Sequence, residues 1–211
     1  MGNPVNISCV HHCHAIVSSL TKIFSGDSNV MAGSLVLNPR APDFLELCKW
    51  VNCNFNNQLW CEDVMFLERN SRSFRSRILR INTTTEILCD KLRTHPLVSN
   101  LFYPKYDCRH YDQYANLPGQ GYGGLFSIVL VNEDYASRFY DSLMVLKGPS
   151  LGTNFTLVCP YTILAHYFEL EWAASFGVEK HLIRVSVGLE DPDALFSIFE
   201  LALTATQGGK K

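Results

Sequence analysis

The feature that most limits how this chain can fold is a long helical pattern from Glu62 to Arg93. Apolar residues recur there at three- and four-residue spacing, which places them on one face of a helix. Pro96 ends the pattern, because proline lacks the N–H group that a helix interior needs. Three threonines at 83–85 lower helix propensity and favour a bend. The apolar face is formed by Val64, Leu67, Phe74, Ile78, Ile81, Leu88 and Leu92.

Arginines cover much of the rest of this helix. A basic stripe could contact a phosphate-rich partner, but a solvated helix face is the simpler interpretation, and we expect it. The formal net charge of the chain is −2, and no basic run or aromatic-basic platform is present. We therefore expect no nucleic-acid partner. The arginines of the stripe are Arg69, Arg72, Arg75, Arg77 and Arg80.

Shorter strand and helix patterns lie on both sides of the long helix. The length of 211 residues and the 47% hydrophobic content suit a globular core of one large domain or two small ones. Gly177 is expected to end a helix, and Asp191 to cap the last one. Apolar runs predict strands at 31–37, 98–103, 125–131 and 182–187. Helical spacing predicts helices at 44–51, 134–146, within 161–176 and from 191 to about 204.

Cysteine usage and hydropathy indicate the compartment. The chain has eight cysteines, and none forms a C-x-x-C pair. It lacks a signal-peptide pattern and any apolar run of the ~20 residues that cross a bilayer. We therefore expect reduced thiols in a cytoplasmic protein without a membrane span. The run His11-His12-Cys13-His14 contains metal-ligand types, but adjacent ligands on a regular element cannot all face one ion, so no metal site is expected.

Two further patterns also have a simple structural interpretation. Residues 119–124 match G-x-G-x-x-G, but they precede an expected strand instead of following one and opening a helix. We therefore expect glycines that permit close packing, not a dinucleotide site. His166 has no evident partner for general-base chemistry, and a packed or hydrogen-bonded histidine is expected.

The segment from Ser18 to Gly26 carries the clearest chemical potential. It places Lys22 after two hydroxyl side chains and before small, turn-forming residues, with hydrophobic chain from Val30 to Leu37. A lysine amine can form a Schiff base with an aldehyde cofactor, while hydroxyls can bind a phosphate. Taken alone, the pattern favours a solvated lysine in a Ser/Thr loop over a cofactor site.

The segment also resembles the lysine segment of the pyridoxal-phosphate enzymes of cysteine and methionine metabolism, the trans-sulfuration family. Further blocks match in the same order at 121–127, 148–152 and 183–191, and the similarity extends from about Val17 to about Leu203. Within the family, the chain resembles the C-terminal half of the fungal cystathionine γ-synthases. The resemblance implies an α/β fold, the C-terminal half of a fold-type I, aspartate aminotransferase-like transferase. Residues 1–82 would be a partial large domain that binds the cofactor, and residues 83–211 a small C-terminal α/β domain.

The resemblance also implies the chemistry. Lys22 would bind pyridoxal 5′-phosphate covalently and then move protons, while the hydroxyls of Ser19 and Thr21 would bind the cofactor phosphate. Arg184 and Ser150 would bind the substrate carboxylate, because a guanidinium offers paired donors that lysine lacks. The reaction would be the γ-replacement that joins an activated homoserine ester to cysteine, as in methionine biosynthesis. The alternatives are a related γ- or β-lyase, and a non-catalytic remnant or interaction module.

By the same resemblance, the chain lacks the phosphate loop, the ring-stacking tyrosine and the acidic partner of the ring nitrogen. It is therefore expected to be truncated, and to need a complementary N-terminal half or a homo-oligomer. Unpaired strand edges and apolar surface would then be exposed, which predicts dimerisation or aggregation of the isolated chain.

Overall fold

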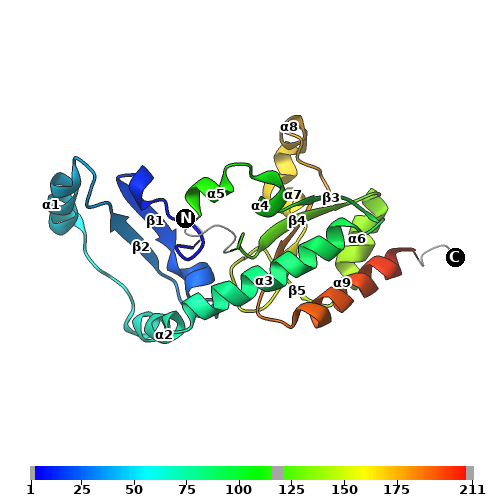
Figure 1. Cartoon of the computed structure of the whole chain (residues 1–211), viewed down its shortest axis with the longest axis horizontal. Helices are drawn as coiled ribbons and strands as arrows, with labels where there is room; N and C mark the ends of the chain where they lie inside the picture. Colours follow the sequence, from blue (N-terminus) through cyan, green and yellow to red (C-terminus); the bar gives the residue numbers. More distant parts are fainter. Residues whose placement is uncertain (1–2, 116–120, 208–211) are drawn as a thin grey trace.

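The computed structural model describes residues 3–115 and 121–207 and has an α/β fold, as expected. A small sheet and a larger sheet lie at opposite ends of the molecule, and the long helix α3 (Phe74–Arg93) joins them (Figure 1). Helix α3 contacts the segment after the first strand at one end and strand β3 and helix α9 at the other. The expected boundary near residue 82 falls inside this continuous helix and stays a prediction.

The small sheet consists of β1 (Ala15–Ser19) and β2 (Gly33–Leu37), which pair antiparallel. A short 3-10 turn, η1 (Val10–His12), precedes β1, and a π-helical turn, η2 (Leu20–Phe24), follows it. Helices α1 (Phe44–Asn54) and α2 (Cys61–Ser71) come next. The sequence predicted β2 and α1 but not β1, because β1 ends in two serines and buries no side chain.

The larger sheet has five strands among the described residues, in the order β3, β4, β7, β6, β5. Neighbouring strands run antiparallel except β5 and β6, which are parallel. Strands β5 and β6 were not predicted, because two and three residues are too few for a periodicity. The bounds are β3 (Val98–Phe102), β4 (Leu125–Leu130), β5 (Leu146–Lys147), β6 (Leu157–Cys159) and β7 (Ile183–Ser186).

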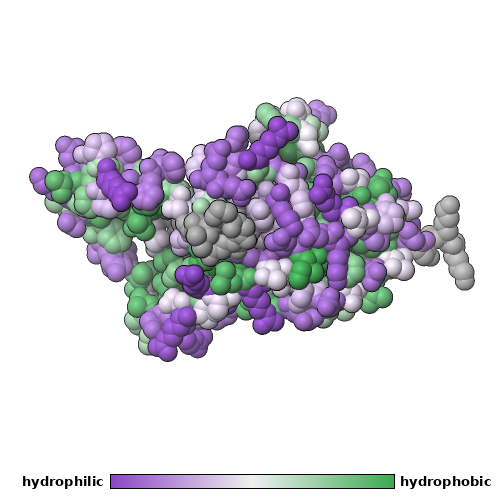
Figure 2. Space-filling model, in the orientation of Figure 1, coloured by the Kyte–Doolittle hydropathy of each residue, from purple (hydrophilic) through white to green (hydrophobic). Residues whose placement is uncertain are grey.

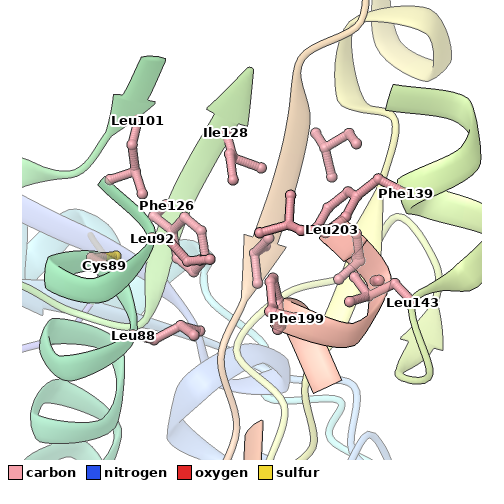
Figure 3. Close-up of a cluster of buried hydrophobic side chains, with 14 of the residues drawn as sticks. Leu88, Cys89, Leu92, Leu101, Phe126, Ile128, Phe139, Leu143, Phe199 and Leu203 are labelled. Carbon is pink, nitrogen blue, oxygen red and sulfur yellow. The ribbon is translucent and has the colours of Figure 1, made fainter. Parts of the chain in front are cut away.

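One face of this sheet is covered by α3, α6 (Glu133–Ser142) and α9 (Pro192–Gln207). Phenylalanines 126, 139 and 199 meet there with leucines from α3 and α9 and with Leu143, which directly follows α6, as Figure 3 shows. Asp191 caps α9, since its Oδ1 accepts hydrogen bonds from the N–H groups of residues 193 and 194. Gly177 has a φ of +75° and ends helix α8, so both predicted helix boundaries are confirmed.

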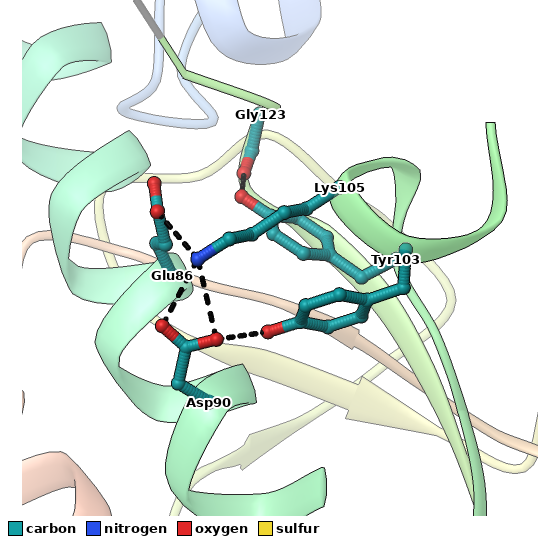
Figure 4. Close-up of polar contacts among 6 residues, drawn as sticks. Glu86, Asp90, Tyr103, Lys105 and Gly123 are labelled. Carbon is teal, nitrogen blue, oxygen red and sulfur yellow. Dashed lines mark hydrogen bonds and ion pairs between the residues drawn. The ribbon is translucent and has the colours of Figure 1, made fainter. Parts of the chain in front are cut away.

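Short helices complete the fold: α4 (Pro104–Asp107), α5 (Tyr111–Tyr114), α7 (Tyr161–His166), η3 (Tyr167–Glu169) and α8 (Leu170–Ser175). Lys105 on α4 bridges to α3, with its Nζ 2.6 Å from Glu86 Oε1 and 3.0 Å from Asp90 Oδ2 (Figure 4). Tyr106 also donates a hydrogen bond to Asp90. The Tyr103 hydroxyl donates to the carbonyl of Gly123 at 2.9 Å. These contacts hold the loop before β4 against α3.

The long helical pattern is interrupted where the sequence did not predict it. Helix α2 ends at Ser71 and α3 begins at Phe74, whereas the threonines at 83–85 lie inside a continuous helix. The predicted bend is not seen, because α3 runs straight and uninterrupted through the threonines (Figure 1). Thr85 is accommodated there with its side chain fully buried and its hydroxyl donating to the Ile81 carbonyl at 2.7 Å. The predicted solvated arginine face is wrong at Arg77, which is 6% exposed.

The structure also bears on the remaining sequence patterns. His166 pairs with Glu169 at 2.7 Å and its ring contacts Trp172, as a packed histidine should. Gly119 and Gln120 lie outside the described residues, but Gly124 confirms close packing, because a Cβ there would lie 2.4 Å from Ile81 Cγ2. No group of metal-ligand side chains suited to an ion occurs among residues 3–115 and 121–207. No helix in that part of the chain is long and apolar enough to cross a membrane.

Candidate functional site

Lys22 lies in the π-helical turn that follows β1. The N–H of Leu20 and that of Gly26 anchor the two ends of this turn, the first on Ala32 O and the second on Lys22 O. The backbone departs from helical geometry at Lys22 itself, with φ −81° and ψ −128°. The Lys22 Nζ donates a hydrogen bond to Ser150 Oγ at 3.2 Å, across 128 positions of sequence.

Ser19 and Thr21 flank this turn in different ways. Ser19 is exposed at the end of β1 and lines the same cleft as Lys22. The Thr21 hydroxyl accepts a hydrogen bond from Ala32 N at 3.0 Å and donates to Ala32 O at 3.3 Å. Thr21 therefore braces the turn against the chain before β2, and only Ser19 offers an open hydroxyl. Phosphate binding by either residue stays a prediction.

Ser150 belongs to a loop between β5 and β6 that lies directly on the lysine segment. Two residues further on, Gly152 donates its N–H to Ser186 Oγ at 2.8 Å. Gly152 has a φ of +71°, and a Cβ there would lie 2.5 Å from the backbone nitrogen of Ile23. Only glycine permits so close a contact with this conformation, so Gly152 brings Ser150 within reach of Lys22.

Arg184 lies on β7, on the face of the sheet away from the main core. Its neighbours Ile183 and Val185 point into that core, and alternation along a strand places Arg184 on the other side. Its Nη2 donates to Pro149 O at 2.6 Å and to Ser150 O at 3.4 Å. Its guanidinium also lies 5.0 Å from the ring centre of Tyr161. Arg184 therefore anchors the loop whose serine contacts Lys22.

The two cations have no carboxylate counter-ion in the part of the chain that the structure describes. Neither Lys22 nor Arg184 forms an ion pair there. Two positive groups joined through one serine offer a site for an anion, and a guanidinium suits a carboxylate best. Near Arg184, burial raises the pKa of the Cys159 thiol and the positive charge of Arg184 opposes the shift.

A cleft of about 320 Å³ opens beside Lys22. Its opposite wall is formed by the N-terminal segment and by tyrosines that pack on each other with ring centres 5.0 Å apart. The buried side chains of Asn6 and Asn82 exchange two hydrogen bonds of 2.8 Å and hold that segment in place. The lining includes Asn3, Asn6, Ser19, Lys22, Tyr111, Tyr122, Leu151, Gly152 and Ser186.

The structure therefore joins Lys22, Ser150 and Arg184 through hydrogen bonds and places Ser19 in the lining of the cleft beside Lys22. The sequence did not indicate Arg77, which donates to the carbonyls of Ile23 and Phe24. A signal was available, because Arg77 precedes Ile81, Thr85 and Leu88 at helical spacing and so shares their buried face.

Comparison with known proteins extends these observations. Residues 1–204 match the family model of the Cys/Met metabolism PLP-dependent enzymes. The chain is 48% identical over 208 residues to a cystathionine γ-synthase of Neurospora crassa, covering 98% of this chain and 34% of that protein. It is 46% identical over 217 residues to the cystathionine γ-synthase of Saccharomyces cerevisiae, covering 99% of this chain and 34% of that protein. The chain thus spans about a third of the length of these two relatives.

Solved structures of similar fold include bacterial and yeast enzymes. A cystathionine γ-lyase from Micromonospora echinospora superposes with a TM-score of 0.83 at 25% identity, over 96% of this chain and 54% of that one. A yeast cystathionine γ-lyase gives a TM-score of 0.86 at 22% identity, over 98% and 54%. These similarities confirm the fold-type I architecture, of which the chain covers a part.

Proposed function

The chain belongs to the Cys/Met metabolism PLP-dependent enzyme family, and from this premise we propose that it is part of a cystathionine γ-synthase. Its cofactor is pyridoxal 5′-phosphate. The proposed reaction joins an activated homoserine ester to cysteine, with replacement at the γ-carbon. The identity of 46–48% to two fungal cystathionine γ-synthases supports this reaction over lyase chemistry.

A single observation carries the proposal: the Lys22 amine is hydrogen-bonded to the loop that Arg184 anchors. An enzyme acting on an amino acid must hold the substrate carboxylate near the group that moves protons. Here the two positive groups come from distant parts of the sequence and meet at one serine. A solvated lysine in a loop would need neither the close approach of Gly152 nor an arginine on β7 that donates to the carbonyls of the same loop.

The side chains present suit the cofactor in chemical kind. Lys22 offers an amine for an aldehyde, the exposed Ser19 hydroxyl offers a phosphate donor, and neither Lys22 nor Arg184 has an ion-pair partner among the described residues. When bound, the cofactor supplies an electron sink for charge that develops on the substrate. Lys22 would hold it covalently, and Ser19 would contact its phosphate.

The residues of the chain then divide the remaining tasks. Arg184 would bind the substrate carboxylate through two N–H groups and fix the orientation of the α-carbon. The Lys22 amine would take and return protons at substrate carbons within its reach. The Ser150 hydroxyl would hold that amine between transfers and donate to the carboxylate. Of these three residues, Lys22 lines the cleft, together with Leu151, the residue that follows Ser150.

A binding experiment tests the proposal. Pyridoxal 5′-phosphate is added to the purified chain, the visible absorption band is titrated, and borohydride reduction with mass spectrometry locates the modified lysine. We expect saturable binding at Lys22, loss in Lys22→Ala, and no change in Lys49→Ala, which alters an exposed lysine on α1. Modification spread over several lysines without saturation would contradict the proposal. Formation of cystathionine from an O-acylated homoserine and cysteine then tests the reaction.

A second candidate is a non-catalytic role in which this chain serves as an interaction module. The observation that favours it is the poor burial of residues 3–73, all of which the structure describes. Within this range, Val30 is the only hydrophobic side chain that is buried. Such a surface fits a partner that completes the small sheet, either a complementary chain of the same family or a second copy. Cofactor binding that appears only after such a partner is added would unite the two candidates.

A further inference from the structure

Arg77 is a buried cation whose donors reach three segments of the chain, one of which directly follows Lys22. Its side chain makes five hydrogen bonds: to Ile23 O (3.1 Å), Phe24 O (2.6 Å), Asn154 Oδ1 (3.1 Å), Asn70 O (3.2 Å) and Ser73 Oγ (3.2 Å). Burial lowers the pKa of the guanidinium and Asp27 opposes this shift, but an arginine stays charged in proteins.

These contacts join three separate segments. Residues 23 and 24 directly follow Lys22, Asn70 and Ser73 flank the break between α2 and α3, and Asn154 belongs to the loop after Gly152. A planar guanidinium with five donors fits such a set, whereas the ammonium group of lysine has three. Arg77 therefore fixes the lysine turn and the Ser150 loop to the same helix.

Asn154 completes the connection from the other side. Its backbone N–H donates to Gly26 O at 2.7 Å, and its side-chain Nδ2 donates to Asp27 Oδ1 at 2.5 Å. A Cβ at Gly26 would lie 2.4 Å from Asn154 Oδ1 and 2.5 Å from Arg77 Nη1, so the turn after Lys22 leaves no free space there. We call Arg77, Asn154 and Gly26 the arginine clasp.

We propose that Arg77 is a positioning residue that sets the Lys22 amine against Ser150 through the arginine clasp. The inference rests on the proposed function for its catalytic meaning, since the amine is useful only where it reaches cofactor and substrate. Its structural content is independent: without the clasp, Lys22 should lose its fixed position. In the loaded enzyme, a displacement of about 1 Å would lower turnover by ~10²-fold.

The first test needs no cofactor. Acetic anhydride labels the amines of the folded chain at low extent, and mass spectrometry gives the rate for Lys22 relative to exposed Lys49 in the same molecule. We expect Arg77→Lys to raise this ratio severalfold and to speed hydrogen exchange in residues 20–26. Arg80→Gln, an exposed arginine of the same helix, is the matched control and should leave both unchanged. Equal ratios in Arg77→Lys and the unaltered chain would overturn the inference.

A milder variant covers the case in which Arg77→Lys does not fold. Asn154→Ala removes one acceptor of the clasp and keeps the guanidinium, and we expect a smaller change in the same direction. With pyridoxal 5′-phosphate added, both variants should shift the pH midpoint of the visible band, whereas a merely stabilising arginine would not. If the unaltered chain binds no cofactor either alone or with a complementary chain, the proposed function fails, while the labelling ratio still decides the inference. If the cofactor binds and the ratio does not change, the inference fails alone.

Discussion

The larger sheet and the small sheet of this chain differ in how far the apolar side chains around them are buried. Around the larger sheet, Phe126, Phe139 and Phe199 are at most 2% exposed. On the small side, Leu45 is 73% and Trp50 64% exposed, and Figure 2 shows hydrophobic residues at the surface over this part of the molecule. A two-stranded sheet is marginal by itself in water.

This difference shows what holds each region in place. The larger sheet is fixed by burial of apolar area, which is non-directional and contributes the most to folding. The lysine segment beside the small sheet is fixed by directed polar contacts from α3 and from the 149–154 loop. The region that carries Lys22 is therefore held more by directed hydrogen bonds than by apolar packing, and four predictions test that contrast.

The largest effect should come from matched substitutions of one residue type. Phe199→Ala should lower the free energy of unfolding by ~3–5 kcal/mol, because it opens a cavity in a closed core. Phe55→Ala, at a side chain that is 65% exposed, should change it by less than ~0.5 kcal/mol. Urea unfolding followed by circular dichroism measures both. Similar losses at the two sites would show that the small region is packed after all.

The next effect concerns self-association. We predict that the unaltered chain dimerises or aggregates at micromolar concentration, since each large apolar side chain that becomes buried contributes ~1.5–3 kcal/mol. The double variant Leu35→Lys with Trp50→Lys should shift light scattering toward the monomer. Phe168→Lys, at a residue 98% exposed on η3 beside the larger sheet, is the control and should change little. A monomeric unaltered chain would contradict the prediction.

The third prediction separates backbone strain from close approach. Gly152 and Gly177 have φ values of +71° and +75°, but a Cβ has open space only at Gly177. Gly177→Ala should therefore cost the ~1–2 kcal/mol of a left-handed backbone. Gly152→Ala should cost more and also release Lys22 from Ser150, since Ile23 must move. The urea midpoints of unfolding and the acetylation rate of Lys22 measure these effects. Equal values in the two variants would contradict the claim that a Cβ at Gly152 displaces Ile23.

The smallest effect is a dependence of stability on pH in the region of the larger sheet. Burial opposes ionisation of Asp90, but hydrogen bonds from Tyr106 and Lys105 outweigh it and lower the pKa of that carboxyl. The resulting stability is present above the unfolded pKa of ~3.9 and is lost as pH falls through the lower folded value. Because Asp90 is half-exposed, Asp90→Asn should cost less than ~1 kcal/mol at pH 7. The free energy of unfolding is measured between pH 7 and 3, with Asp141→Asn as the control. It should decrease less steeply toward low pH in Asp90→Asn, whereas Asp141→Asn should behave like the unaltered chain.

The sequence predicted the elements whose signals are local. Asp191 as a cap, Gly177 as a helix end and the strands at β3 and β4 depend on neighbouring residues, and all are confirmed. Strands β5 and β6 were not predicted, because they form by pairing with strands elsewhere in the sequence and their own few residues carry no periodic signal.

For the site, the sequence named Lys22, Ser150 and Arg184 through resemblance to a family, and the structure places them together. It could not predict the orientation of Thr21, whose hydroxyl is engaged by the backbone of Ala32. It also predicted that Arg77 is solvated, because charge alone favours an exposed helix face. The carbonyls to which Arg77 donates lie more than fifty residues earlier in the sequence. Whether a charged side chain is buried or solvated depends on hydrogen-bond partners that are remote in sequence.

The loop from Pro149 to Gly152 has one further consequence. Its carbonyls set the reach of Arg184, its serine sets the reach of Lys22, and its glycine sets their separation. On the proposed function, the position of the substrate carboxylate and that of the Lys22 amine therefore depend on the same four residues. A substitution in this four-residue segment is then expected to change both positions at once.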